Sequence, residues 1–135
     1  MTYLAFDLGA SNGRAMTGTF KNSVLTLKKV HRFENTPIVS EGLLSWDVDT
    51  LFENIKEGIR KAFQEQGELP VSIGIDAWGV DIALLDASGQ LVRAPLHYRN
   101  IENTDRNMER FFGHMTQHDL YMKTGIQMLN INTVF

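Results

Sequence analysis

The feature that most constrains the fold is a glycine-bracketed turn at residues 7–14 (D-L-G-A-S-N-G-R), which follows one apolar strand pattern and precedes another. Gly9 and Gly13 permit positive φ and let the backbone approach a ligand without an intervening Cβ. Small residues between them expose backbone N–H groups, as an anion-binding nest requires. Asp7 can hold Mg²⁺ or its water shell, and Arg14 can add a planar cationic donor. The spacing predicts a phosphate-binding turn, and it fits a plain hairpin equally well.

Two better-known phosphate-binding loops do not match this turn. The dinucleotide fingerprint G-x-G-x-x-G is absent. The motif G-x-x-x-x-G-K-[ST] fails because Arg14 follows Gly13 and the spacing is one residue short. Both of those loops open a helix, whereas the residues after this turn have a strand pattern.

The hydrophobic pattern predicts an α/β domain, with a mixed sheet that begins as a β-meander and is flanked by helices. Strands are expected at residues 2–7, 15–20 and 24–33, followed by an irregular segment at 34–45. A helix is expected from Val48 until Gly67 ends it, with Asp47 as its N-cap or, alternatively, Thr50 and Glu53 as a capping box. Further patterns predict strands at 71–76 and 82–85, a hairpin turn at 86–89, and helices at 102–115 and 118–123. One apolar stripe is assigned to the core: Met108, Phe111, Phe112 and Met115.

Composition excludes several classes of function. The net charge is −3 and no basic cluster exceeds Lys28-Lys29, which argues against a nucleic-acid or anionic-membrane partner. The chain contains no cysteine, so it has no disulfide framework, which is compatible with a reducing cytosol. Its first residues contain no signal or membrane-spanning pattern. The apolar ending at residues 130–135 favours a truncated domain, with a buried edge strand as the alternative.

Motifs along the whole chain resemble the FGGY carbohydrate kinase family, and most closely its rhamnulokinases. Residues 7–14 resemble the first phosphate motif of the actin, Hsp70 and sugar-kinase superfamily. Other matches are H-R-F at 31–33, W-D-V-D at 46–49, S-I-G-I-D-A-W-G-V-D at 72–81, P-L-H-Y-R-N at 95–100, and Y-x-x-T-G-I-Q with N-T at 121–127 and 132–133. Asn12, Ala77 and Asn100 depart from the common Ser, Thr and Asp, and the last two put the sugar preference in doubt.

The resemblance implies an ATP-dependent transfer of phosphate to the 1-hydroxyl of L-rhamnulose, with L-fuculose or D-xylulose as alternative ketoses. It implies a ribonuclease H-like, actin-like ATPase fold, of which residues 1–135 are the N-terminal part of the first, sugar-binding domain. ATP and Mg²⁺ are the implied cofactors, and the cytoplasm is the implied location. The implied ATP-phosphate residues are Asp7 (also through a water to Mg²⁺), Ala10, Ser11, Asn12, Gly13 and Arg14, and the implied sugar residues are Trp78, Gly79, Asp81 and Arg99.

The same resemblance limits what these residues can do alone. It places the catalytic Asp beyond residue 135, so we expect no catalytic base and no turnover here. His118-Asp119 is expected to be an exposed helix start, and His97 a structural histidine. The alternatives are a non-catalytic sugar- or nucleotide-binding module and a piece with no autonomous function. Apolar surface left uncovered by truncation predicts self-association.

Overall fold

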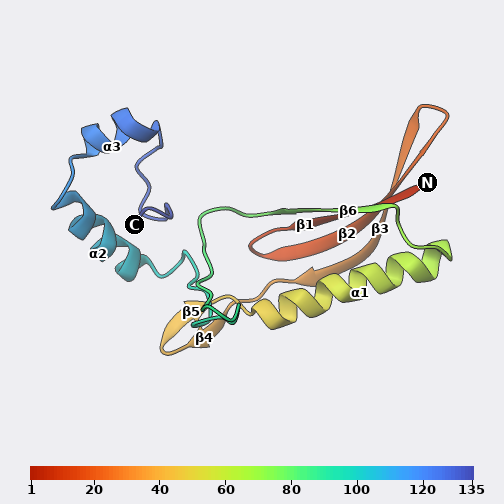
Figure 1. Cartoon of the computed structure of the whole chain (residues 1–135), viewed down its shortest axis with the longest axis horizontal. Coiled ribbons are helices and arrows are strands. Elements are labelled where there is room, and N and C mark those ends of the chain that lie inside the picture. Colours follow the sequence, from red (N-terminus) through yellow and green to blue (C-terminus); the bar gives the residue numbers. More distant parts are fainter. The chain divides into compact units, whose positions relative to one another are not determined.

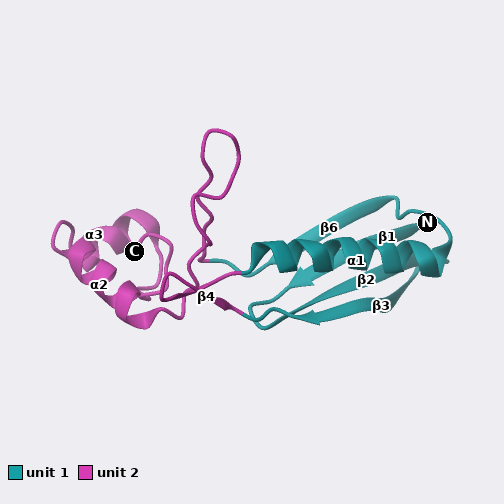
Figure 2. Ribbon diagram, turned by 90° about the horizontal axis from the view of Figure 1, so that it is seen from below, with its two compact units in different colours: residues 1–36, 47–79 teal, residues 37–46, 80–135 magenta.

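The computed structural model describes residues 1–135. Two compact units are present, coloured separately in Figure 2. The first comprises residues 1–36 and 47–79, and the second comprises residues 37–46 and 80–135.

A four-stranded mixed sheet forms the centre of the first unit, with strand order β3-β2-β1-β6 (Figure 1). Strands β1 (Thr2–Leu8), β2 (Asn12–Lys21) and β3 (Val24–Glu34) form the antiparallel meander that the sequence predicts. Strand β6 (Ser72–Ala77) lies parallel to β1. The long stretch between β1 and β6 includes helix α1, which provides the crossover that a parallel pair requires.

Helix α1 (Val48–Gln66) covers one face of this sheet, as Figures 1 and 2 show. The Asp47 side chain accepts a hydrogen bond from the Thr50 N–H at its start, and Gly67 adopts the left-handed conformation at its end. Strand β1 alternates, so its buried side chains, Leu4, Phe6 and Leu8, pack on the helix side. The predicted cap, helix and stop are confirmed, and Asp7 is left on the opposite face.

The second unit contains a short hairpin that the sequence analysis placed in an irregular segment. Strands β4 (Ile38–Ser40) and β5 (Leu43–Ser45) pair in an antiparallel ladder. Glu41 and Gly42 between them both have positive φ, 53° and 78°. Gly42 supplies the conformation that such two-residue turns demand, and three-residue strands are too short to show an alternating pattern.

Other boundaries in the second unit also differ from the predictions. Residues 82–85 form no strand, apart from an isolated bridge between Leu85 and Leu91. The turn at 86–89 is confirmed, because the Asp86 side chain accepts from the N–H groups of Ser88 and Gln90. Helix α2 (Ile101–Phe112) ends earlier than predicted, and α3 (Gln117–Thr124) follows Thr116, its N-cap.

The apolar stripe on α2 is not a buried core, contrary to the prediction. No residue of α2 is buried, and its apolar stripe is only half-covered. Phe111 and Phe112 instead form a ring cluster with Phe135, with ring centroids 5.3 and 5.4 Å from that of Phe135.

None of the helices in the chain is long and apolar enough to cross a membrane.

Candidate functional site

The predicted phosphate turn lies between β1 and β2, where the Gly9 N–H donates to the Asn12 carbonyl at 2.9 Å. Asn35, which is buried, holds the turn from the end of β3. Its backbone N–H donates to the Ser11 carbonyl and its Nδ2 to the Gly9 carbonyl, both at 3.0 Å. Two carbonyl oxygens are thereby engaged inside the protein, which removes acceptors that would repel an anion.

The two glycines of the turn serve packing and not left-handed backbone, which corrects the prediction. Neither Gly9 nor Gly13 has a positive φ. A Cβ on Gly13 would lie 2.2 Å from Cζ of Phe33, and one on Gly9 would lie 3.0 Å from the Asn12 carbonyl oxygen. The sequence therefore indicated correctly that the turn needs glycine, but close packing and not a positive φ is the reason.

Charged side chains form a row across the face of the sheet opposite α1. Arg14 on β2 is opposite Asp7 on β1, and Asp7 is level with Asp76 on β6. Arg14 Nη2 and Nε lie 2.6 and 2.8 Å from Asp7 Oδ2. Both side chains are about half exposed, so the pair contributes at most about 1 kcal/mol and is readily exchanged for a ligand.

The two carboxylates of this row suit Mg²⁺ that is bound to a nucleotide better than they suit a metal ion held by protein side chains alone. No group of three or more His, Cys, Asp or Glu residues is arranged to hold a metal ion. Mg²⁺ bound to nucleotides usually takes one or two carboxylates, several waters and phosphate oxygens. Asp7 and Asp76, on adjacent strands, provide that number of carboxylates.

The four residues implied for the sugar are divided between the two units. Trp78 packs against the core of the first unit, and its N–H donates to the Leu8 carbonyl at 3.1 Å. Gly79 follows it at the exposed surface. Asp81 and Arg99 belong to the second unit. Asp81 lines a cavity there, whereas the Arg99 guanidinium lies over the Tyr98 ring, 5.3 Å from its centroid.

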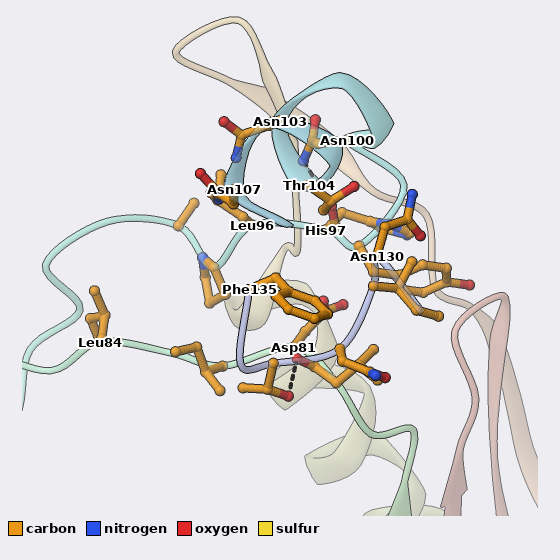
Figure 3. A pocket seen from close by; sticks show the side chains of 18 of the residues that line it. Asp81, Leu84, Leu96, His97, Asn100, Asn103, Thr104, Asn107, Asn130 and Phe135 are labelled. Carbon is orange, nitrogen blue, oxygen red and sulfur yellow. Dashed lines mark hydrogen bonds between the residues drawn. The ribbon is translucent and has the colours of Figure 1, made fainter. Parts of the chain in front are cut away.

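A cavity of the second unit measures about 270 Å³ (Figure 3). The Asp81 carboxylate in its wall accepts a hydrogen bond from the Trp46 indole N–H at 2.5 Å. Trp46 is buried, and its ring stacks on that of His97 with 4.0 Å between the ring centroids. Packing and the indole hydrogen bond therefore fix the position of Asp81.

His97 is a functional candidate that the sequence analysis treated as structural. It is 1% exposed and lines the cavity. Its Nδ1 accepts from the Arg99 backbone N–H at 3.0 Å. Burial lowers the pKa of His97, the Asp81 carboxylate partly opposes this, and Arg99 adds to it. The imidazole is therefore neutral at pH 7. In the sequence, the only sign of a functional role for His97 is its position in the P-L-H-Y-R-N motif.

Asn100 has a structural reason to differ from the common Asp. Its Oδ1 accepts from the Leu44 N–H, and its Nδ2 donates to the carbonyls of Leu44 and His97. An aspartate has no donor for those two carbonyls. The amide ties β5 to the segment that contains His97, so this departure stabilises the cavity wall. Ala77, the second departure that bears on the sugar preference, is exposed at the end of β6.

Comparison with known proteins identifies the family. The profile described as FGGY family of carbohydrate kinases, N-terminal domain, matches residues 2–135. The chain belongs to the FGGY family of carbohydrate kinases. It is 39% identical over 132 residues to a rhamnulokinase of Oceanobacillus iheyensis and 41% identical over 133 residues to one of Bacteroides thetaiotaomicron. Each match covers 98% of this FGGY chain but only 28% and 27% of the relative.

Solved structures confirm the predicted fold of this FGGY chain. Xylulose kinase from Lactobacillus acidophilus matches 96% of the chain and 26% of its own length, with a TM-score of 0.78 and 13% identity. Plasmodium falciparum glycerol kinase with ADP matches 98% of the chain and 27% of its own length, with a TM-score of 0.74 and 13% identity. At such identities the similarity establishes the actin-like ATPase fold alone.

Proposed function

We propose that the protein is an ATP-dependent sugar kinase that phosphorylates the 1-hydroxyl of L-rhamnulose. The observation that carries the proposal is the 39–42% identity to three rhamnulokinases across 98% of the chain. Because the chain spans only 27–28% of these relatives, residues 1–135 are proposed as the N-terminal part of a sugar-binding first domain. MgATP is the proposed phosphoryl donor, and the cytosol the proposed location.

In this proposal the β1–β2 turn binds the phosphates of ATP. Backbone N–H groups of Ala10 and Ser11, with the side chains of Ser11 and Asn12, donate to phosphate oxygens. Support comes from Asn35, which engages the carbonyls of Gly9 and Ser11 and so leaves the donor side of the turn for the ligand. Arg14 exchanges Asp7 for a phosphate oxygen, a stronger charge-assisted partner when bound in a fork geometry.

Release of Asp7 from Arg14 has a second consequence. Its carboxylate, beside Asp76, becomes available to the waters of the Mg²⁺ that accompanies ATP. Bound Mg²⁺ neutralises charge on the transferring phosphoryl group. The chain's own contribution is to position the phosphates and to supply paired carboxylates at the end of two parallel strands.

Sugar recognition is assigned to Trp78 and Gly79 in the first unit and to Asp81 and Arg99 in the second. Asp81 carries the clearest support, because the Trp46 indole N–H fixes its carboxylate in a cavity wall. A fixed carboxylate accepts a sugar hydroxyl without further ordering cost. We propose that the base that removes the proton from the 1-hydroxyl lies outside residues 1–135. Its absence alone costs about 10²–10⁴ in rate.

The test is a coupled assay of ADP release with the full-length protein, MgATP and a panel of L-rhamnulose, L-fuculose and D-xylulose. We expect the highest kcat/KM for L-rhamnulose. A preference for either other ketose would reject the substrate assignment but keep the kinase. Saturable binding of a ketose without ADP release would favour the non-catalytic module. An Arg14→Met variant should raise KM for ATP and leave KM for the ketose unchanged.

A further inference from the structure

Two residues that line the cavity of the second unit each have a buried N–H donor without a hydrogen-bond partner. They are Nε of Arg93 and Nε2 of His97. The ring proton of His97 belongs on Nε2, because Nδ1 accepts from the Arg99 N–H. Arg93 reaches the Glu41 carboxylate only through Nη2, at 3.9 Å. Because buried donors are normally satisfied, two orphaned donors on residues that line one cavity indicate that a ligand supplies the acceptors.

Other groups in the cavity define the chemistry of that ligand. Asn103 and Asn107, one turn apart on α2, line it and can both donate and accept. Figure 3 shows their amides beside the cavity. The three further asparagines in the wall are held by protein partners: Asn100, Asn130 and Asn132.

The charges and the apolar side chains of the wall restrict the chemical class of the ligand further. The wall contains one carboxylate, Asp81, and one guanidinium, Arg93, so its formal charges cancel and it favours a ligand without net charge. Leu84, Leu96 and Phe135 give the cavity an apolar side that suits the carbon skeleton of a small molecule. The combination fits a neutral molecule with several hydroxyl groups, and a cavity of about 270 Å³ suits one monosaccharide.

We propose that Arg93 and His97 are specificity-determining residues that donate hydrogen bonds to hydroxyl oxygens of the ketose. This inference rests on the proposed sugar kinase function. It adds two residues to those that the family resemblance implies for sugar binding. His97 is suited to this role because its ring is held between Trp46 and Tyr98, with centroid separations of 4.0 and 4.6 Å. A donor fixed by stacking loses little freedom on binding and discriminates hydroxyl positions sharply.

Two substitutions of His97 separate recognition from structure. In His97→Gln the amide nitrogen takes the place of Nε2 and keeps the donor, whereas the acceptor for the Arg99 N–H is lost. In His97→Asn the amide oxygen takes the place of Nδ1 and keeps that acceptor, whereas the donor into the cavity is lost. Calorimetric titration of the full-length protein with L-rhamnulose should give a Kd within about threefold of wild type for His97→Gln. For His97→Asn we expect a Kd about tenfold higher.

Arg93 provides a second, independent arm. Arg93→Met removes the N–H groups and keeps an unbranched apolar stem, and should raise the Kd for L-rhamnulose about tenfold or more, since charged donors form the stronger hydrogen bonds. Arg60→Met, on the exposed surface of α1, is the matched control and should leave the Kd unchanged. Titration with gluconate, an anionic polyol, should give weaker binding than the neutral ketose.

The outcomes separate this inference from the proposed function. If wild-type protein gives no saturable heat with any ketose, the proposed function fails. If it binds L-rhamnulose and His97→Asn and Arg93→Met bind equally well, the inference is overturned while the kinase stands. If His97→Gln loses binding and His97→Asn keeps it, His97 is structural and the inference is overturned for that residue. Should the His97 variants fail to fold by circular dichroism, Arg93→Met, with a half-exposed side chain, decides the matter.

Discussion

Replacing Gly13 by alanine should destabilise the first unit through the Phe33 ring, before any ligand is considered. The added Cβ would lie 2.2, 2.7 and 2.8 Å from three carbons of that ring. Favourable carbon contacts begin near 3.5 Å, so the ring must move by about 1 Å. Phe33 packs against the core and stacks on His31 at 5.5 Å, which resists that movement.

The expected size follows from two opposing terms. Overpacking a core costs typically about 1–3 kcal/mol. Alanine also restricts the unfolded chain, which offsets about 0.4–1 kcal/mol at a position where φ is not positive. A net loss of about 1–2 kcal/mol in the free energy of unfolding is predicted from these values.

Urea unfolding followed by circular dichroism measures this loss for Gly13→Ala, Phe33→Leu and the double variant. Leucine removes the ring atoms that the new Cβ would meet, so the double variant should be more stable than additivity predicts by at least about 0.5 kcal/mol. Unchanged stability of Gly13→Ala, or strict additivity with Phe33→Leu, would refute the packing explanation. Unchanged stability with weaker ATP binding would show that the glycine serves ligand approach instead.

Three further predictions concern single side chains. Asp47→Ala removes the acceptor for the Thr50 N–H and should lower the free energy of unfolding by about 0.5–2 kcal/mol in urea titrations, and an equal midpoint would contradict the capping role. Burial lowers the pKa of His97, so the folded state binds fewer protons than the unfolded chain as the pH falls. The melting temperature should therefore decrease when the pH is lowered from 7.5 to 5.5, and it should decrease less in His97→Gln. Asn35→Ala removes the side-chain donor to the Gly9 carbonyl, keeps the backbone N–H that bonds to Ser11, and should raise the Kd for ATP while leaving the Kd for the ketose unchanged in calorimetry.

Local signals allowed most of the first unit to be predicted from the sequence. Asp47 and Gly67 mark the ends of α1 through short-range hydrogen bonds and a left-handed residue, both of which depend on neighbouring positions only. The turn at residues 7–14 was located correctly for the same reason. The positive φ expected at its glycines was wrong, and the close contact at Gly13 was not predictable because the ring that a side chain there would meet belongs to Phe33, which lies twenty residues further along.

The second unit was harder to predict because long-range contacts determine it. Asn100 bonds to Leu44 across 56 positions, and Trp46 bonds to Asp81 across 35. No spacing rule reveals such pairs in a single sequence. The stripe on α2 had helical periodicity, yet periodicity does not show whether a partner surface is present. In the sequence alone His97 is therefore a lone histidine, because its neighbours in the fold come from distant positions in the chain.

The two-site proposal is tested most directly by nuclear magnetic resonance of the ¹⁵N-labelled protein, titrated first with MgATP and then with L-rhamnulose. We expect MgATP to shift the backbone amide resonances of residues 9–14, and L-rhamnulose to shift the side-chain N–H resonances of Arg93 and His97. Shifts confined to other residues, or no saturable shift with either ligand, would contradict the proposed sites of phosphate and sugar binding.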